Sequence, residues 1–206
     1  RVRDELVAFN GYGGFTPDGR AYVLRLDRDP SGELRLPPRP WTNVIANEGF
    51  GTIVSETGAG CTWSENSREH RLTPWSNDPV TDPHGEALYV RDEETREFWS
   101  ALPGPVPRAA EYEVRHGFGS SRFKHTTDGL EHEVEIFVPR HDPVKVSRLR
   151  IRNRSGRRRR LAAFAYTHLA SGAYADPKRD IETELEGPAR TLWIRDHGAG
   201  DFASRV

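Results

Sequence analysis

The segment from residue 61 to residue 82 contains two tryptophans, two arginines and a row of short polar residues, without the periodicity of a core element. Tryptophan rings stack on the apolar faces of sugars, and arginine, asparagine and aspartate supply the directional hydrogen bonds that hydroxyl groups need. The segment therefore predicts contact with carbohydrate or, as the alternative, an ordered surface loop whose tryptophans close the edge of the core. The candidate binding residues are Trp63, Asn66, Arg68, Arg71, Trp75, Asn77 and Asp78.

Acid and base residue types also alternate along one short segment, where glutamates occupy positions 131, 133 and 135 and His132 stands between two of them. Side chains two residues apart on a strand point in parallel and do not flank a shared substrate bond. The glutamates are thus predicted to form a polar face. His132 falls on the apolar face, where a core histidine is expected.

The elements that must position these residues are predicted to be strands. Residues 130–138 alternate with period two, and Asp-Gly pairs at 18–19 and 128–129 are typical of tight hairpin turns. No long helical period occurs, and prolines and glycines are spread as strand punctuation. The prediction is an all-β fold, a large antiparallel β-sandwich with few or no long helices. Further strands are expected at 21–26, 51–55, 87–90, 111–116, 144–153, 161–168 and 191–195.

We make separate predictions for two segments that connect the expected strands, residues 57–86 and 157–160. Residues 57–86 are expected to form one elaborate loop, and loops of that length in compact domains are usually functional or disordered. The basic run 157–160 is interpreted as a hairpin turn between strands 144–153 and 161–168, with its arginines in solvent. Because the net charge is -1 and no aromatic residues interleave the basic run, nucleic-acid binding is not predicted.

Length and composition fit one domain. A chain of 206 residues can form a single β-sandwich, predicted here over residues 1–206. The absence of methionine suggests a piece of a longer protein. The single Cys61 excludes an internal disulfide and a cysteine-rich zinc site, and it is expected to be a small buried thiol in a reducing, cytoplasmic compartment. No metal or cofactor is implied, and no apolar run is long enough to cross a bilayer.

Seven motifs occur in one order along the chain, at residues 10–20, 40–51, 61–82, 88–92, 98–100, 116–119 and 134–139. Together they resemble the amino-terminal domain of glycoside hydrolase family 94, formerly glycosyltransferase family 36. That family contains cellobiose and chitobiose phosphorylases and the phosphorylase-like region of cyclic beta-1,2-glucan synthases. The sequence of residues 63–79 looks most like the glucan synthase branch. It reads Trp-Ser-Glu-Asn-Ser-Arg-Glu-His-Arg-Leu-Thr-Pro-Trp-Ser-Asn-Asp-Pro.

The resemblance implies a supersandwich fold similar to that of galactose mutarotase, followed in the parent enzyme by a helical linker and an (alpha/alpha)6 barrel. The barrel would hold the catalytic aspartate and the phosphate site for inverting phosphorolysis of a beta-glucosidic bond. No residue of this chain is therefore expected to be catalytic. The implied partners are a beta-linked glucan or oligosaccharide, the chain's own barrel domain and a second copy in a homodimer, with the parent possibly attached to the inner membrane.

Two other functions stay open at this point. The fold implied by the resemblance also occurs in mutarotases, so His116 and a strand glutamate facing one open groove could exchange protons at an anomeric carbon. In a purely structural module, the same tryptophans would instead pack against another part of the longer protein and never contact sugar.

Overall fold

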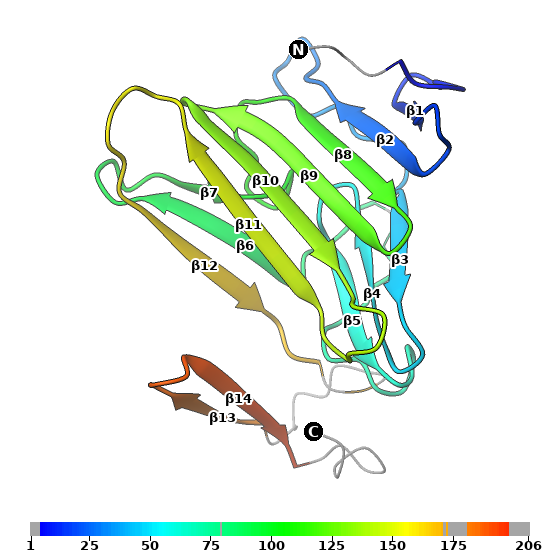
Figure 1. The fold of residues 1–206 in the computed structure, drawn as a ribbon, viewed down its shortest axis with the longest axis vertical. Coiled ribbons are helices and arrows are strands. Elements are labelled where there is room, and N and C mark those ends of the chain that lie inside the picture. The colour runs from blue at the N-terminus through cyan, green and yellow to red at the C-terminus, as the bar shows by residue number, and fades with distance from the viewer. Residues whose placement is uncertain (1–4, 79, 171, 173–180, 198–206) are drawn as a thin grey trace.

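The computed structural model describes residues 5–78, 80–170, 172 and 181–197, and all of its regular elements are strands. Figure 1 labels them. Their bounds are β1 Gly13–Phe15, β2 Ala21–Leu26, β3 Thr42–Ala46, β4 Phe50–Ser55, β5 Gly60–Ser64, β6 Glu86–Asp92, β7 Phe98–Ser100, β8 Tyr112–Gly117, β9 Ser120–Thr127, β10 Leu130–Phe137, β11 Val146–Asn153, β12 Leu161–Thr167, β13 Ile181–Glu186 and β14 Thr191–Asp196.

The largest sheet has the order β1-β2-β8-β9-β10-β11, and every pair of neighbours in it is antiparallel. Strand β10 alternates strictly between buried and half-buried residues, as its sequence predicts. The turn before it places Asp128 at φ 49° and Gly129 at φ 74°, the left-handed pair that a two-residue hairpin requires. Sequence pattern and turn chemistry therefore agree over this sheet.

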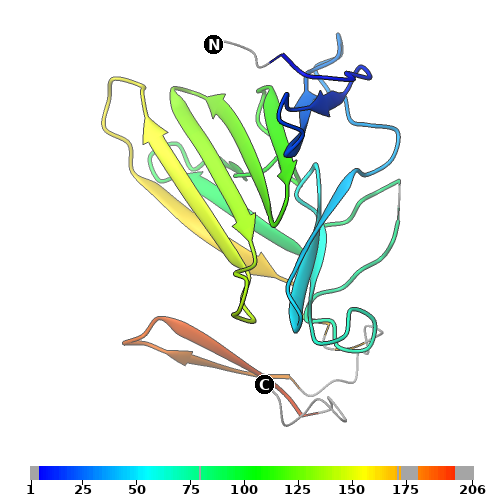
Figure 2. The same ribbon diagram turned by 45° about the vertical axis from the view of Figure 1, so that its right-hand side comes forward.

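Three smaller sheets complete the fold, with the orders β3-β4-β5, β12-β6-β7 and β13-β14. Figures 1 and 2 show the β12-β6-β7 sheet behind the six-stranded sheet and β3-β4-β5 along one side. The layers share one apolar core, in which Val114, Phe123 and Val134 of the large sheet join Val90 and Trp99 of the layer behind. The prediction of an all-β sandwich without long helices is confirmed.

The predicted hairpin around the basic run is wrong. Strands β11 and β12 do not pair, because β11 joins β10 in the large sheet whereas β12 joins β6 in the other layer. Nor are all the arginines in solvent. The Arg159 side chain is only 7% exposed, and its Nε and Nη2 atoms lie 2.9 and 2.8 Å from Oδ2 of the buried Asp92. This pair anchors the start of β12 to the end of β6 within one sheet, a contact that local sequence does not reveal.

The predicted loop 57–86 also needs correction, because its first part contains strand β5, Gly60–Ser64. Cys61 lies in that strand, and its burial confirms the predicted buried thiol. Trp63 is paired in register with Gly51 of β4. Its indole covers this glycine so closely that a Cβ on Gly51 would lie 2.3 Å from Cζ2. The Trp63 ring thus covers part of one face of the β3-β4-β5 sheet.

Gly51→Ala is expected to lower the free energy of unfolding by about 1–3 kcal/mol, because the new methyl group would displace the Trp63 ring from its well-packed position. Urea denaturation followed by tryptophan emission measures both the loss and the ring displacement. Gly49→Ala is the control, since a Cβ there meets nothing within 4 Å. Equal stability of the two variants would contradict the packing argument.

Candidate functional site

A cavity of about 210 Å³ opens beside the second half of the 61–82 segment. Its walls come from residues 39, 40 and 42 on one side and from residues 74–78, 82 and 83 on the other, so residues distant in sequence meet there. Trp75 supplies its only aromatic ring among the described lining residues, and Trp75 and Asp78 are half-buried while Asn77 is exposed. The lining residues are Arg39, Pro40, Thr42, Pro74, Trp75, Ser76, Asn77, Asp78, Asp82 and Pro83.

The shape of this wall is set by polar turn contacts. Oδ1 of Asp78 accepts hydrogen bonds from the backbone N–H groups of Val80 at 2.9 Å and Thr81 at 3.1 Å, and Oδ2 accepts one from the Thr81 hydroxyl at 2.7 Å. The Thr81 hydroxyl, followed by the two backbone N–H groups, lowers the pKa of Asp78. Asp78 thus holds its own turn while lining the cavity.

The other four predicted residues organise the preceding turn and β5 instead of the cavity. Trp63 covers Gly51, as described above. Oδ1 of Asn66 accepts hydrogen bonds from the backbone N–H groups of Arg68 and Glu69, both at 2.9 Å. Nε of Arg71 donates to a backbone carbonyl of the same turn, 2.9 Å away, and Nε of Arg68, whose side chain is 75% exposed, lies 3.2 Å from the Glu69 carboxylate. Three of the seven candidates therefore line the cavity, namely Trp75, Asn77 and Asp78. The other four lie in β5 or in the turn after it, namely Trp63, Asn66, Arg68 and Arg71.

Asp82 is a cavity residue that the sequence analysis did not select. Its Oδ2 atom accepts hydrogen bonds from the Ser55 and Thr57 hydroxyls, each 2.6 Å away, and both of these residues are buried. Its backbone is left-handed at φ 39°, as is that of Asn77 at φ 51°. Non-glycine residues hold such conformations only where their surroundings stabilise them, often at functional sites. The only sequence signal for this arrangement was the presence of Asp82 at the end of the predicted segment.

Behind Asp82 lies a second carboxylate. Glu56 is 2% exposed and its Oε2 accepts the Trp41 N–H at 2.7 Å. Burial raises the pKa of Glu56 to about 7, and the negative charge of Asp82 adds to the rise. Burial also lowers the pKa of the neighbouring His84. The wall behind the cavity is therefore an ionisable cluster at the end of β4.

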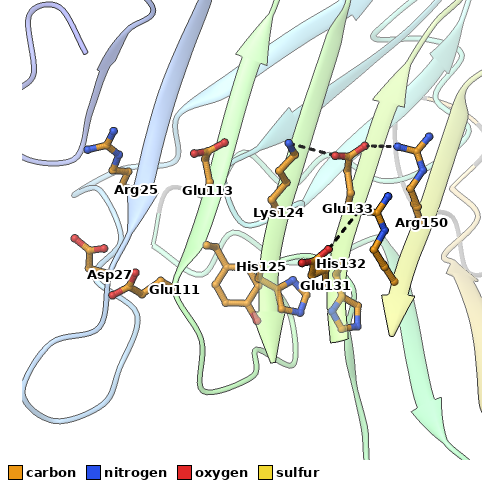
Figure 3. Close-up of a pocket in the computed structure, with 12 residues that line it drawn as sticks. Arg25, Asp27, Glu111, Glu113, Lys124, His125, Glu131, His132, Glu133 and Arg150 are labelled. Carbon is orange, nitrogen blue, oxygen red and sulfur yellow. Dashed lines mark hydrogen bonds and ion pairs between the residues drawn. The ribbon is translucent and has the colours of Figure 1, made fainter. Parts of the chain in front are cut away.

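A larger hollow of about 600 Å³ lies on the six-stranded sheet (Figure 3). A row of alternating charge crosses five of its strands in register, and its members are Arg25, Glu113, Lys124, Glu133 and Arg150. Glu133 lies 3.3 Å from the Lys124 ammonium and 3.2 Å from the Arg150 guanidinium. Glu135 pairs in the same way with Arg122 at 2.7 Å and with Arg148. These carboxylates are neutralised by bases on neighbouring strands, which confirms the prediction of a polar face.

His132 lies on the opposite face of β10, as predicted. It is 2% exposed, and its Nε2 accepts the Trp99 indole N–H at 3.2 Å. Its ring stacks on that of His125, with centroids 4.2 Å apart and planes 7° from parallel. His132 is therefore a core histidine: it belongs to the lining of the hollow together with Glu131 and Glu133, but it is almost completely buried.

His116 is also held inside the structure. Its Nε2 lies 3.1 Å from the Trp41 carbonyl oxygen and its Nδ1 lies 2.8 Å from the Ser121 hydroxyl. Because a carbonyl can only accept, Nε2 donates and Nδ1 accepts from the hydroxyl. Burial lowers the pKa of His116 to about 4. Both nitrogens of a neutral ring are thus occupied, and the geometry offers no support for a mutarotase-type proton transfer at His116.

Comparison with known families identifies the sandwich. Residues 20–205 match the family described as glycosyl hydrolase 94, supersandwich domain. The chain belongs to this family. The supersandwich domain is 45% identical over 203 residues to the cyclic beta-(1,2)-glucan synthase NdvB of Rhizobium meliloti (strain 1021), covering 98% of this chain and 7% of that protein. It is 33% identical over 177 residues to the N,N'-diacetylchitobiose phosphorylase of Vibrio furnissii, covering 84% of this chain and 21% of that protein.

A third relative is the solabiose phosphorylase of Paenibacillus borealis, 27% identical over 177 residues, with 80% of this chain and 21% of that protein covered. The supersandwich domain therefore spans between 7% and 21% of the length of these three relatives. The names of all three refer to synthesis or phosphorolysis of glycosides. The resemblance stated from the seven motifs is confirmed.

Within the described residues, no group of three or more His, Cys, Asp or Glu side chains is arranged to hold a metal ion. The same part of the chain has no helix that is long and apolar enough to cross a membrane.

Proposed function

We propose that this supersandwich domain is the non-catalytic, carbohydrate-associated part of a longer glycoside phosphorylase or cyclic beta-(1,2)-glucan synthase. The observation that carries the proposal is the cavity at Trp75, which combines one aromatic ring with polar side chains in a family whose relatives are named for glycosides. Aromatic stacking combined with a few placed polar groups is the usual composition of a small-ligand site. The ligand would be a beta-linked glucan or oligosaccharide.

The proposed role is to bind and orient sugar, while bond cleavage takes place in a catalytic barrel elsewhere in the longer protein. The ion pairs of Glu135 support this division, because the hydrogen bond from Arg122 and the charges of Arg122 and Arg148 lower the pKa of this carboxyl and make it a poor general base. At about 210 Å³ the cavity has room for little more than one sugar ring. We place the longer protein in the cytoplasm as a homodimer, attached to the inner membrane if it is a glucan synthase.

Trp75→Ala in the full-length protein is expected to raise KM for the glucan about tenfold with little change in kcat, because burying one aromatic face on sugar contributes roughly 1–2 kcal/mol. Saturation kinetics and light-scattering mass measure the two readouts. Phe118→Ala is the control, since that aromatic ring is 88% exposed at the β8-β9 turn. Unchanged KM together with unchanged oligomer mass would contradict the proposal.

A purely structural interaction module is the second candidate, and one observation favours it. Large apolar side chains are exposed on β12 and on the β13-β14 hairpin, which forms no ladder with another described strand. They are Phe164, Tyr166, Leu185, Leu192 and Trp193. Exposed apolar surface of this kind is typical of an interface. A Trp75→Ala protein with altered oligomer mass and unaltered KM would favour this candidate over sugar binding.

A further inference from the structure

We propose that Asp82 is the polar anchor of the Trp75 cavity, and that its Oδ1 atom accepts hydrogen bonds from the hydroxyl groups of a pyranose ring stacked on Trp75. This inference rests on the proposed function and adds a specificity residue to it. Asp82 lines the cavity beside Trp75, and among the described residues no donor contacts its Oδ1 atom. A sugar seated there would meet a flat apolar ring and a carboxylate oxygen.

The Asp82 carboxylate is held in one orientation. Two hydroxyl donors, from Ser55 and Thr57, both reach its Oδ2 atom at 2.6 Å, a length typical of charge-assisted O–H···O hydrogen bonds. Ser55 is 1% exposed and Thr57 is 7% exposed, so both donors are fixed by packing. Because one oxygen is held by two donors from the end of β4, the other oxygen is oriented before any ligand arrives. Such preorganisation reduces the entropic cost of binding.

The backbone of one cavity wall has two left-handed residues. They are Asp82 and Asn77, residue types that adopt this conformation more readily than other non-glycine residues. The N–H of Asp82 donates to the Asp78 carbonyl at 3.2 Å, so these two residues are held close together. Asp82 is thus fixed through its backbone as well as through its side chain.

The buried Glu56 adds no second carboxylate to the cavity. Its residue is 2% exposed, its Oε2 accepts a hydrogen bond from the Trp41 N–H, and it is not among the cavity-lining residues. Asp82 and Arg39 both line the cavity, from its two wall segments, and their side chains are an acceptor and a donor for hydroxyl groups. This combination of acceptor, donor and aromatic ring suits a neutral polyol ring better than an anion.

The test measures binding of a beta-linked glucose disaccharide and its monodeoxy analogues to the full-length protein by isothermal titration calorimetry. Removing the sugar hydroxyl that donates a hydrogen bond to Asp82 is expected to weaken binding to the wild type about 10- to 100-fold, the range for hydrogen bonds to charged groups. Asp82→Asn should weaken binding of the parent disaccharide by a similar factor. The variant should also bind the parent disaccharide and that one deoxy analogue with equal affinity, which would identify a direct contact between Asp82 and the missing hydroxyl.

Asp18→Asn is the matched control. Its carboxylate also accepts a threonine hydroxyl at 2.6 Å, from Thr16, but it lies in the β1-β2 turn and does not line the cavity. It should leave both affinity and the deoxy pattern unchanged. Thermal unfolding of each variant separates lost binding from lost folding. If Asp82→Asn does not fold, the wild type alone still decides, because equal affinity for every monodeoxy analogue would overturn the proposal.

The two proposals fail in different ways. If Trp75→Ala weakens binding while Asp82→Asn does not, the anchor is wrong and the carbohydrate role stands. If neither variant changes binding, both proposals are overturned. If Asp82→Asn weakens binding equally for all analogues and leaves the deoxy pattern intact, Asp82 has no direct contact with a hydroxyl and the anchor is again wrong.

Discussion

Replacing Lys145 with methionine is expected to lower the free energy of unfolding by about 3 kcal/mol, because it leaves the Glu86 carboxylate without its cation in a mostly buried site. The Lys145 ammonium pairs with Oε2 of Glu86, and the two side chains are 15% and 20% exposed. Oε1 of Glu86 accepts hydrogen bonds from the hydroxyl groups of Thr62, at 2.6 Å, and Thr73, at 2.7 Å. This cluster joins β5, β6 and the segment before β11.

The sign of this effect follows from opposing influences on Glu86. Burial raises the pKa of its carboxyl, but the charge and hydrogen bond of Lys145 and the two threonine hydroxyls together lower it below its usual value. Without Lys145 only the hydroxyls oppose burial, so the pKa of Glu86 should rise. A carboxyl with a depressed folded-state pKa adds stability above its unfolded pKa, and that stability is lost as pH falls. Lys145→Met should therefore be most damaging near neutral pH.

Urea denaturation at pH 7 measures the loss. The double variant Glu86→Gln/Lys145→Met should recover most of it, because the unpaired charge is removed together with its partner. Arg195→Met is the control, since the Arg195 and Glu184 side chains of that pair are 50% and 60% exposed and such pairs contribute less than about 1 kcal/mol. A loss at Lys145 no larger than at Arg195 would show that Glu86 is adequately solvated without its partner.

Local patterns predicted the strands, whereas pairing between distant strands needed the structure. Alternation in β10 and the turn at Asp128 and Gly129 depend on neighbours in sequence, and both predictions hold. The supposed hairpin at 157–160 fails because β12 pairs with β6, about seventy residues earlier, and because Arg159 is bound to Asp92. Two adjacent strand patterns do not show whether the chain returns in the same sheet or crosses to the other layer.

The candidate site divides along the same line. Trp75 could be found from residue type alone, because an aromatic ring in a polar loop suggests a contact surface. Asp82 could not, because its significance lies in Ser55 and Thr57, more than twenty residues earlier at the end of β4. Trp63 shows the converse error, since its ring is used to cover Gly51 in the sheet. Residue type predicts the class of ligand, while register and distant hydrogen bonds decide which residues can contact it.

Acid is expected to destabilise the fold steeply below pH 6.5, because the buried His125 and His132 and the half-buried His116 are neutral in the folded state. Burial is the largest cause for each, and it lowers the pKa of His116 and His132 to about 4 and that of His125 to about 3. The Arg108 charge and the His132 ring add to the effect on His125. Between pH 6.5 and pH 4 the unfolded chain therefore binds up to three protons that the folded chain does not.

Glu56 opposes this trend over part of the same range. Its folded pKa of about 7 exceeds its usual value of 4.5, so its contribution is fully present below pH 4.5 and is lost as pH rises through 7. Near pH 5.5 the unfolded state holds almost three histidine protons that the folded state lacks, and the folded state holds about one at Glu56 that the unfolded state lacks. The net difference there is about two protons, or roughly 3 kcal/mol lost per pH unit.

Urea midpoints measured from pH 7.5 to pH 4.5 test this balance, because the slope of unfolding free energy against pH counts the protons. His125→Phe should flatten the slope by about one proton, since phenylalanine can stack on His132 without titrating. Glu56→Gln should steepen it by about one proton, the opposite sign at a site of similar burial. A slope near zero in the wild type would mean that the buried rings reach solvent before the chain unfolds, so that the stacked pair opens without losing the sandwich.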